Sequence, residues 1–270
     1  YNHEWKGWKN HDLLFLNNGE TKIIKSDVVI FVLGGASWKV TGSVGDWTSY
    51  FEEKGIQINS FYPSNCAYKI NWNSELVKQI SGHALKNCAF SCDNSHKKGE
   101  AVLTDFGIEG SGIYGLSKGI REQIIRDQQA ELFIDFKPEL SLQEIQNRFE
   151  NRGKLSIKDV LEKKINLSAV QIQLLKYQTS KEEYNQPEII SELIKKFPLI
   201  LTDFAPVDDA ISTVGGVALD EVNDNLELKK LPNHYCMGEM LDWDAPTGGY
   251  LLQACFSMGK FVGDKLNQKL

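Results

Sequence analysis

The stretch Cys236-Met237-Gly238-Glu239-Met240-Leu241-Asp242-Trp243-Asp244-Ala245-Pro246-Thr247-Gly248-Gly249-Tyr250 decides how this chain is interpreted. The apolar lead-in from Leu231 to Met237 predicts a short buried strand, and Gly238 allows the backbone to turn sharply after it. Glu239 and Asp242 then place two carboxylates at the end of that strand. They could serve as paired acids, as caps of turns or as acceptors for ligand hydroxyl groups, and the context favours ligand positioning over proton transfer.

A helix is predicted directly after this acidic turn, opening at Thr247-Gly248-Gly249. Its apolar residues recur at helical spacing on one face, at Leu251, Cys255, Met258 and Val262. The backbone N–H groups at a helix N-terminus favour electron-rich ligands. Strand, acidic turn and helix start together therefore predict a ligand-binding site.

Composition excludes several classes of protein. The chain has 270 residues, 41% hydrophobic and 24% charged, as in globular domains. Its net charge of -6 argues against nucleic acid as the main partner, and no apolar run approaches the roughly 18 residues of a membrane span. The five scattered cysteines predict reduced thiols in a cytoplasmic protein, with no metal site. The sequence leaves the oligomeric state open.

The order of patterns predicts an α/β domain interrupted by an insert. Residues 1–57 form its first part, where the apolar run from Asp27 to Leu33 predicts a strand buried on both faces of a parallel sheet. Residues 58–204 form the insert, β-rich over 58–137 and helical over 138–200. Residues 205–270 complete the α/β domain.

Three glycine pairs lie in the two α/β parts, at Gly34-Gly35, Gly215-Gly216 and Gly248-Gly249. Each pair alone is best explained as a tight turn, but together they indicate a bound cofactor. Trp38, Trp47 and Trp243 lie beside these pairs and could wall a ring-shaped ligand, although most tryptophans are core anchors. The segment from Gly99 to Ser111 is equally compatible with a pocket-lining loop and with a hairpin connection.

Four segments together resemble the HI0933-like flavoproteins, also called the YhiN or BaiN-like family of FAD-dependent oxidoreductases. These segments are Val32-Leu33-Gly34-Gly35-Ala36-Ser37, Thr213-Val214-Gly215-Gly216-Val217, Gly238-Glu239-Met240-Leu241-Asp242 and Thr247-Gly248-Gly249-Tyr250. The resemblance covers essentially the whole chain. It implies an FAD/NAD(P)-binding Rossmann-like α/β domain, here incomplete, with an inserted β-barrel-like and small helical subdomain.

The resemblance also implies which residues meet FAD. Gly34, Gly35 and Ala36 would approach the middle of the cofactor, with Gly216 in the neighbouring segment. Gly238, Glu239 and Asp242 would face its ribityl–pyrophosphate region. Backbone N–H groups of Thr247, Gly248, Gly249, Tyr250 and Leu251 would face the pyrimidine edge of the flavin.

Departures from the family pattern affect the substrate side. Many members have Asn where this chain has Leu251, so a side-chain contact there is lost. The family often has Thr-His and Ser-Gly-Pro where this chain has Thr104-Asp105 and Glu109-Gly110-Ser111, so the substrate pocket bordered by Thr104 to Ser111 is expected to differ.

Such flavoproteins begin with a strand–GxGxxG–helix unit that holds the ADP half of FAD. We find no such unit here and expect the chain to be the C-terminal part of a flavoprotein. The 270 residues alone are therefore expected to bind FAD weakly or not at all. Stoichiometric FAD retained through gel filtration would refute this expectation.

Two functions remain open. The first is an FAD-dependent oxidoreductase acting on a small molecule, with NAD(P) as a possible second cofactor and with no side chain assigned as acid or base. The second is a binding or regulatory module that keeps a flavoprotein scaffold without its redox chemistry.

Overall fold

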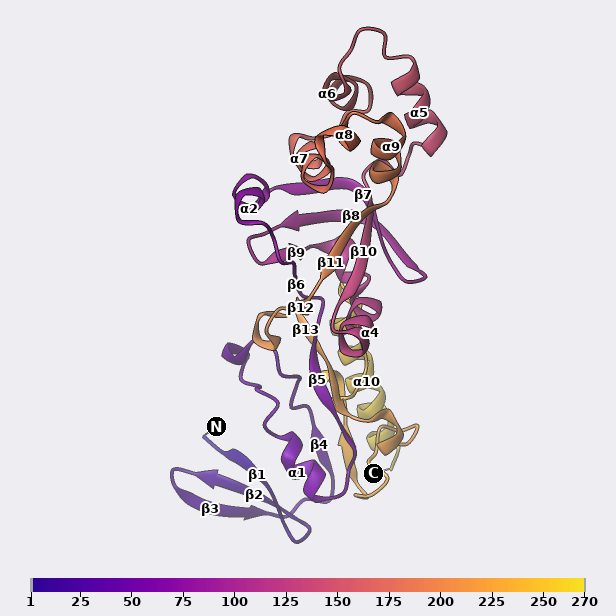
Figure 1. Ribbon diagram of the computed structural model, residues 1–270. Helices are drawn as coiled ribbons and strands as arrows, with labels where there is room; N and C mark the ends of the chain where they lie inside the picture. Colours follow the sequence, from indigo (N-terminus) through magenta and orange to yellow (C-terminus); the bar gives the residue numbers. More distant parts are fainter. Residues whose placement is uncertain (1, 270) are drawn as a thin grey trace. The chain divides into compact units, whose positions relative to one another are not determined.

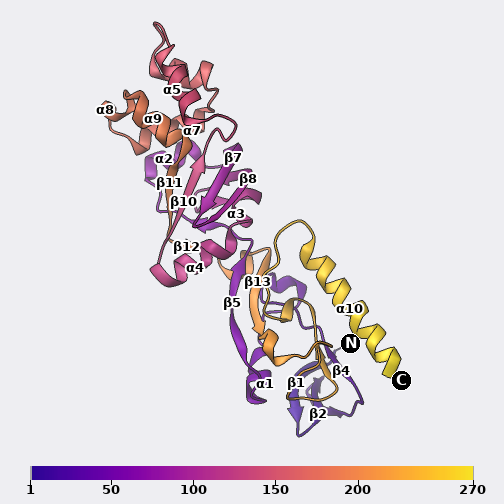
Figure 2. The same cartoon turned by 90° about the vertical axis from the view of Figure 1, so that its right-hand side faces the viewer.

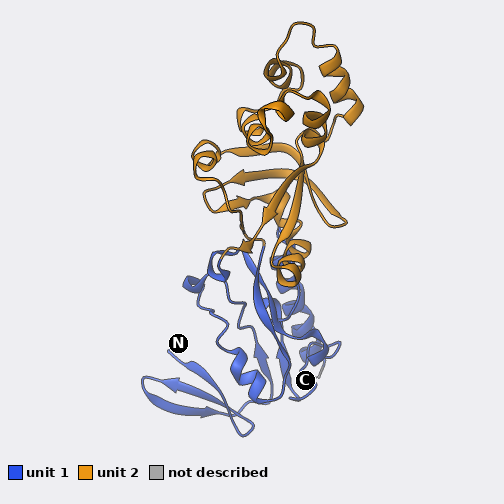
Figure 3. Ribbon diagram, viewed as in Figure 1, with its two compact units in different colours: residues 1–64, 206–270 blue, residues 65–205 orange. Residues whose placement is uncertain are grey.

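The computed structural model describes residues 2–269, except for the side chain of Lys269. The chain divides into two compact units, one of residues 1–64 and 206–270 and one of residues 65–205 (Figure 3). The sequence placed the first boundary at residue 57, seven residues earlier. The difference arises because β5 (Ile58–Ser64) pairs with β13 (Ser212–Val217) inside the first unit.

The first unit begins with a three-stranded antiparallel sheet of β1 (Glu4–Lys9), β2 (Asp12–Asn17) and β3 (Glu20–Ile24) (Figure 1). The predicted hairpin was drawn from Tyr1, which lies outside the described residues. Trp5 and Trp8 project from β1 onto Phe31, with ring centroids 5.0 and 5.5 Å away. This aromatic cluster fixes the sheet to the core of the unit.

A parallel pair of strands forms the centre of this unit, β4 (Val29–Phe31) beside β14 (His234–Cys236). The prediction that the first strand is buried on both faces is wrong. Val29 and Phe31 are buried, whereas Ile30 is 46% and Val32 is 65% exposed. One face of the pair, with Phe31 and Cys236, packs against the core of the unit. On the other face Tyr235 of β14 is buried beside Val262 of α10, but its neighbour Ile30 of β4 stays exposed, so the apolar run of β4 is buried at alternate positions.

The sequence suggested a turn at Gly215-Gly216, but the pair lies within β13. The pairing of β13 with β5 shifts register between Val214 and Gly216, which marks a β-bulge. Both glycines have positive φ, of 110° and 104°. Such angles suit glycine, which explains why the bulge needs the pair.

Helices complete the first unit. They are α1 (Thr48–Glu53), the long α10 (Tyr250–Lys269) and the short helices η1 (Lys39–Thr41), η3 (Val207–Asp209), η4 (Leu219–Glu221) and η5 (Gly238–Met240). The predicted apolar face of α10 is the packed one: Val262 is buried, and Met258 packs beside it against Tyr235 and Met237. Figure 2 shows α10 running as one uninterrupted helix from Tyr250 to Lys269.

The second unit contains a seven-stranded antiparallel sheet, in the order β11-β10-β7-β8-β9-β6-β12. Its strands are β6 (Tyr68–Lys69), β7 (Ala84–Cys92), β8 (Ser95–Leu103), β9 (Gly107–Glu109), β10 (Ala130–Asp135), β11 (Phe197–Leu201) and β12 (Asp203–Phe204). In the described part of the chain no pairing joins β11 to β12, so the expected barrel-like sheet is open. The segment from Gly99 to Ser111 contains a hairpin, in which residues 104–106 connect the end of β8 to β9.

The helices of the second unit lie mostly in its second half. They are α2 (Ser74–Ile80), α3 (Ser111–Tyr114), α4 (Ser117–Asp127), α5 (Leu142–Glu150), α6 (Ile157–Asp159), the π-helix η2 (Val160–Lys164), α7 (Ala169–Gln178), α8 (Lys181–Tyr184) and α9 (Pro187–Lys195). Capping boxes at Ser141, Ser168 and Ser180 start three of them.

The GxGxxG pattern does occur once outside a dinucleotide-binding unit, at Gly110, Gly112 and Gly115. It follows the three-residue antiparallel strand β9 and opens the four-residue helix α3. A dinucleotide fingerprint joins a strand and a long helix of a parallel βαβ unit. The pattern here has a packing role instead, because a Cβ built on Gly112 would lie 2.6 Å from the ring of Phe90.

Candidate functional site

The candidate site lies where two parallel strands end. The chain leaves β4 through Val32 and Leu33 into Gly34-Gly35, and it leaves β14 through Met237 into Gly238-Glu239. Because β4 and β14 are parallel neighbours, both exits lie at the same sheet edge. In open α/β sheets, ligands bind at this carboxyl edge.

Glu239 joins the two exits. Its Oε1 accepts hydrogen bonds from the backbone N–H of Thr213, at 2.9 Å, and from the Thr213 hydroxyl, at 3.4 Å. That hydroxyl oxygen also accepts a bond of 3.3 Å from the N–H of Ala36. Within the described residues, no hydrogen bond reaches Oε2 of Glu239. This carboxylate is thus held in place through one oxygen and keeps the other as an acceptor for a ligand hydroxyl.

Asp242 has a different setting, because both of its carboxylate oxygens bond to protein groups. Oδ1 accepts from the backbone N–H of Gly215 at 3.0 Å, and Oδ2 accepts from the amide of Asn59 at 2.5 Å. Asp242 therefore ties the β13 bulge to β5. It can act on a ligand by positioning these backbone segments.

The glycines of the site fall into two groups. Gly35, Gly215 and Gly216 are packed against the protein: a Cβ on them would lie 2.1 Å from Oγ1 of Thr213, 2.3 Å from the Ser60 carbonyl and 2.3 Å from the Met240 carbonyl, respectively. At these three positions, contacts within the fold are by themselves sufficient to require glycine.

The second group has open surroundings. Gly34, Gly238, Gly248 and Gly249 all have positive φ, and a Cβ on any of them would meet nothing closer than 3.4 Å. Gly248 and Gly249 are exposed and Gly34 is half-buried, so a ligand can approach these three backbones closely. Gly238 is buried, and its positive φ serves the turn into η5.

The N-terminus of α10 borders the same region. A Cβ on Gly238 would lie 3.6 Å from Sγ of Cys255, in the second turn of α10, so the helix start and the η5 turn are neighbours. The first N–H groups of the helix have no intrahelical partner, and the helix dipole is positive at this end. Gly248, Gly249 and Tyr250 are exposed there. The arrangement can stabilise negative charge on a ligand.

The three tryptophans named from the sequence have separate settings. Trp47 is buried in the core, and the indole N–H of Trp243 donates to the Gly238 carbonyl at 3.0 Å. Trp38 is 52% exposed and has a positive φ of 55°, unusual for an aromatic residue. Its backbone N–H donates to the Asp208 carbonyl at 3.4 Å. Of the three, Trp38 is the most exposed.

Sequence reasoning missed Thr213 and Asn59 as individual site residues. Thr213 connects Ala36 with Glu239, and Asn59 holds Asp242. Thr213 lay inside a quoted glycine motif, so its proximity to Gly215 was the available signal. Nothing in the sequence around Asn59 marks it, because its role follows from the pairing of β5 with β13.

All five cysteines are free thiols, and four of them are buried. Burial raises the pKa of Cys66, Cys88 and Cys92 to about 11 and raises the pKa of Cys236 further in the same direction. Burial, and then the charge of Glu239, also raise the pKa of the partly exposed Cys255. Among the described residues, no group of His, Cys, Asp and Glu could hold a metal ion.

We predict that Cys255 reacts first with a thiol reagent and that the other four cysteines react only when the protein unfolds. A thiol with a pKa near 11 has roughly one thiolate in a thousand at pH 8, and burial blocks the reagent as well. Mass spectrometry of alkylated native protein at pH 8 measures this order. Rapid labelling of Cys66 or Cys88 in the native protein would contradict the described packing.

Residues 1–265 match the family described as HI0933-like protein Rossmann domain. The chain belongs to this family. The resemblance drawn from the glycine and Gly238-Glu239 motifs is thereby confirmed, as is the Rossmann-like α/β class with an insert. No helix among residues 2–269 is both long and apolar enough to cross a membrane.

Two proteins that are similar to this HI0933-like chain are longer than it is. It is 22% identical over 263 residues to a 3-dehydro-bile acid delta(4,6)-reductase of Clostridium scindens, an alignment covering 92% of this chain and 64% of that protein. The chain thus spans about two thirds of the length of this relative. The crystal structure of 3-ketosteroid delta1-dehydrogenase from Sterolibacterium denitrificans, in complex with 1,4-androstadiene-3,17-dione, matches with a TM-score of 0.42 and 13% identity, over 99% of this chain and 58% of that chain.

Proposed function

We propose that this chain belongs to an FAD-dependent oxidoreductase and supplies the part of the protein that holds the flavin end of the cofactor. The observation that supports the proposal best is the sheet edge where Gly34 and Gly238 follow two adjacent parallel strands beside the start of α10. Glycine turns at both strand ends, a fixed carboxylate and an exposed, positive helix end fit a flavin with its ribityl chain.

Each part of the site has a proposed task. The backbone of Gly34 would allow the cofactor to approach, Gly238 would shape the turn that presents Glu239, and Oε2 of Glu239 would accept a hydrogen bond from a ribityl hydroxyl group. The N–H groups from Thr247 to Leu251 would face the pyrimidine edge of the flavin, where they favour negative charge. When bound, FAD would supply hydride or electron transfer, for which the protein provides binding and orientation.

Gly35, Gly216 and Asp242 would act as positioning residues. Gly35 allows Thr213 and Glu239 to pack against the first glycine turn, and Gly216 allows β13 to lie against the Met240 carbonyl. Asp242 holds the β13 bulge, because its Oδ1 accepts a hydrogen bond from the N–H of Gly215. Ala36 would be fixed through its bond to Thr213.

A small molecule is the proposed substrate, in keeping with the name of the Clostridium scindens relative. No particular substrate follows from that name, because an identity of 22% leaves the substrate pocket free to differ. The same proposal includes NAD(P) as electron donor. It also includes a cytoplasmic location, which we infer from the unpaired cysteines.

The test is the visible absorbance spectrum of the natural protein isolated from its own cells, together with FAD binding by variants of that protein. We expect flavin absorbance bands and an affinity for FAD that falls roughly tenfold in Glu239→Ala, as for one lost charge-assisted hydrogen bond. Glu53→Ala, an exposed acid on α1, is the matched control and should leave the affinity unchanged.

The variant Glu239→Gln distinguishes the contact of Glu239 with Thr213 from its proposed contact with the ligand. Its amide oxygen can still accept from the N–H of Thr213, so the unfolding midpoint should stay close to that of the wild type while FAD affinity falls. A colourless natural protein that takes up no FAD would overturn the proposal and favour the alternative of a non-catalytic binding module on a flavoprotein scaffold.

A further inference from the structure

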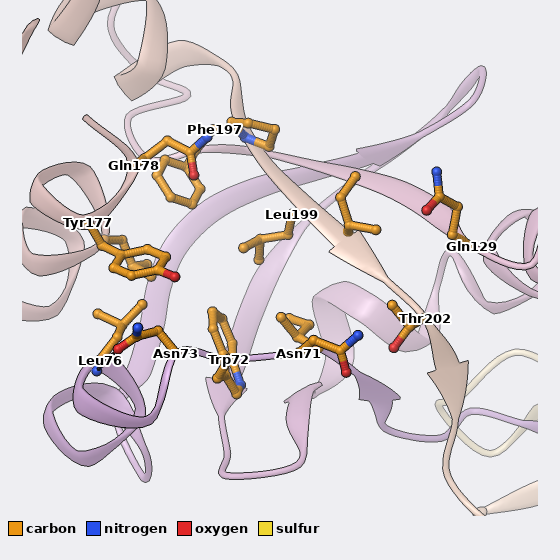
Figure 4. Close-up of a pocket in the computed structure, with 14 residues that line it drawn as sticks. Asn71, Trp72, Asn73, Leu76, Gln129, Tyr177, Gln178, Phe197, Leu199 and Thr202 are labelled. Carbon is orange, nitrogen blue, oxygen red and sulfur yellow. Dashed lines mark hydrogen bonds between the residues drawn. The ribbon is translucent and has the colours of Figure 1, made fainter. Parts of the chain in front are cut away.

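The second unit contains a cavity that no part of the proposed flavin site uses. Its volume is about 530 Å³, within the range of sites for small organic ligands. It is lined by β11, the end of α7, and the segment that runs from β6 into α2 (Figure 4). All of its lining residues lie between Ile70 and Thr202, inside one compact unit.

The floor of this cavity is apolar and fixed. Leu76, Leu174, Phe197 and Leu199 line it and are each less than a tenth exposed, so their positions are set by the core of the unit. Such a floor offers dispersion contacts and apolar area to a ligand without any rearrangement of the protein.

Two aromatic side chains flank the floor. In Figure 4, Trp72 and Tyr177 extend from different elements toward the space in front of Leu199. The indole N–H of Trp72 donates to the Thr104 carbonyl at 3.0 Å, which fixes that ring. Tyr177 is 52% exposed although it is large and aromatic. Fixed and exposed rings of this kind present faces on which a ring-containing ligand can stack.

The rim is polar but carries no charge. Among the fourteen residues drawn in Figure 4, there is no Asp, Glu, Lys, Arg, His or Cys. The side-chain amides of Asn71, Gln129 and Gln178 line the cavity and form no hydrogen bond within the described part of the chain. They therefore offer both donors and acceptors to a ligand.

We propose that this cavity binds an uncharged, ring-containing small molecule, apolar through most of its body and bearing carbonyl or hydroxyl groups at its ends. A charged ligand would lose its hydration without meeting an opposite charge, which is costly. A neutral ring body gains contact with the floor and the two aromatic rings, and its polar ends meet the free amides. This binding site stands independently of the proposed flavin site.

Two dyes with the same ring skeleton test the charge preference on the full chain. N-phenyl-1-naphthylamine is uncharged, and 1-anilinonaphthalene-8-sulfonate adds one sulfonate. In fluorescence titrations we expect the uncharged dye to bind at least tenfold more tightly than the sulfonated dye. Equal affinity of the two dyes for the wild-type cavity would overturn the proposal.

Variants assign the binding to this cavity. Tyr177→Ala should weaken the uncharged dye about tenfold, and Tyr177→Phe, which keeps the ring, should change it less than twofold. The matched control is Phe256→Ala, which removes an exposed aromatic ring from α10 in the other unit. It should leave the affinity for the uncharged dye unchanged. A loss in Phe256→Ala with none in Tyr177→Ala would place the dye elsewhere and overturn the proposal.

A charge introduced at the rim gives a second, independent test. Ile200 is exposed on the edge strand β11, where a lysine is structurally tolerated. Ile200→Lys should raise the affinity for the sulfonated dye about tenfold and reduce the preference for the uncharged dye. An unchanged ratio of the two affinities in this variant would contradict binding in the cavity.

Discussion

Replacing Gly216 with alanine is expected to lower the free energy of unfolding by about 3 kcal/mol, because two costs add. The residue has a φ of 104°, a conformation that strains any residue with a side chain. A Cβ would also lie 2.3 Å from the carbonyl oxygen of Met240, which is backbone and cannot rotate away. Urea denaturation measures the loss.

The matched control is Gly259→Ala, in α10. A Cβ on Gly259 would meet nothing within 4 Å, and the residue is helical. Alanine there should stabilise the protein by about 0.5–1 kcal/mol, since glycine weakens a helix interior. Equal effects of the two substitutions would mean that the β13 bulge tolerates a side chain and that its contact with η5 is loose.

The sequence predicted elements well where the pattern is local. The predicted helix was expected to have an apolar face of Leu251, Cys255, Met258 and Val262. Met258 and Val262 pack against Tyr235 and Met237, Cys255 lies beside Gly238, and Leu251 is half-buried. Residues 138–200 were expected to be helical, and within them the helix Pro187–Lys195 begins at its proline. In both cases residues within one or two turns decide the outcome.

Predictions were wrong for segments whose structure depends on partners distant in the sequence. The Asp27–Leu33 run predicted two buried faces, but the packing of Ile30 depends on which elements cover the sheet and not on the run itself. The Gly215-Gly216 pair predicted a turn, since a bulge shows only once β5 is paired with β13. Residues 138–200 were predicted to be helical, but the bounds of α7 within them were not, because most of its faces are buried, which removes the apolar and polar alternation.

The candidate site was predictable in composition but not in the roles of its residues. Glu239 and Asp242 were expected to behave alike, as two carboxylates near one ligand. The structure separates them, because Glu239 keeps one oxygen without a protein partner among the described residues and Asp242 uses both. The donors that make the difference, Asn59 and Gly215, lie 183 and 27 residues away along the chain. Only the three-dimensional pairing brings them to these carboxylates.

Replacing Asp242 with alanine is accordingly expected to lower the free energy of unfolding by about 2 kcal/mol. The change leaves the N–H of Gly215 and the amide of Asn59 without acceptors in a half-buried place. Asp242→Asn should cost less than half as much, because its amide oxygen can still accept from Gly215 while its NH₂ group can donate to a reoriented Asn59. Denaturant unfolding of the three proteins gives the comparison.

The control for this prediction is Asp264→Ala, which removes an exposed carboxylate paired with Lys260 on α10. Exposed pairs at this spacing contribute about 0.5 kcal/mol or less. If Asp242→Ala costs no more than this control, pairing with β5 alone holds the β13 bulge. If it costs about 2 kcal/mol and also weakens FAD binding, Asp242 stabilises the segment that places Thr213 against Glu239. That result would assign it an indirect role in the site, in contrast to the direct role of Glu239.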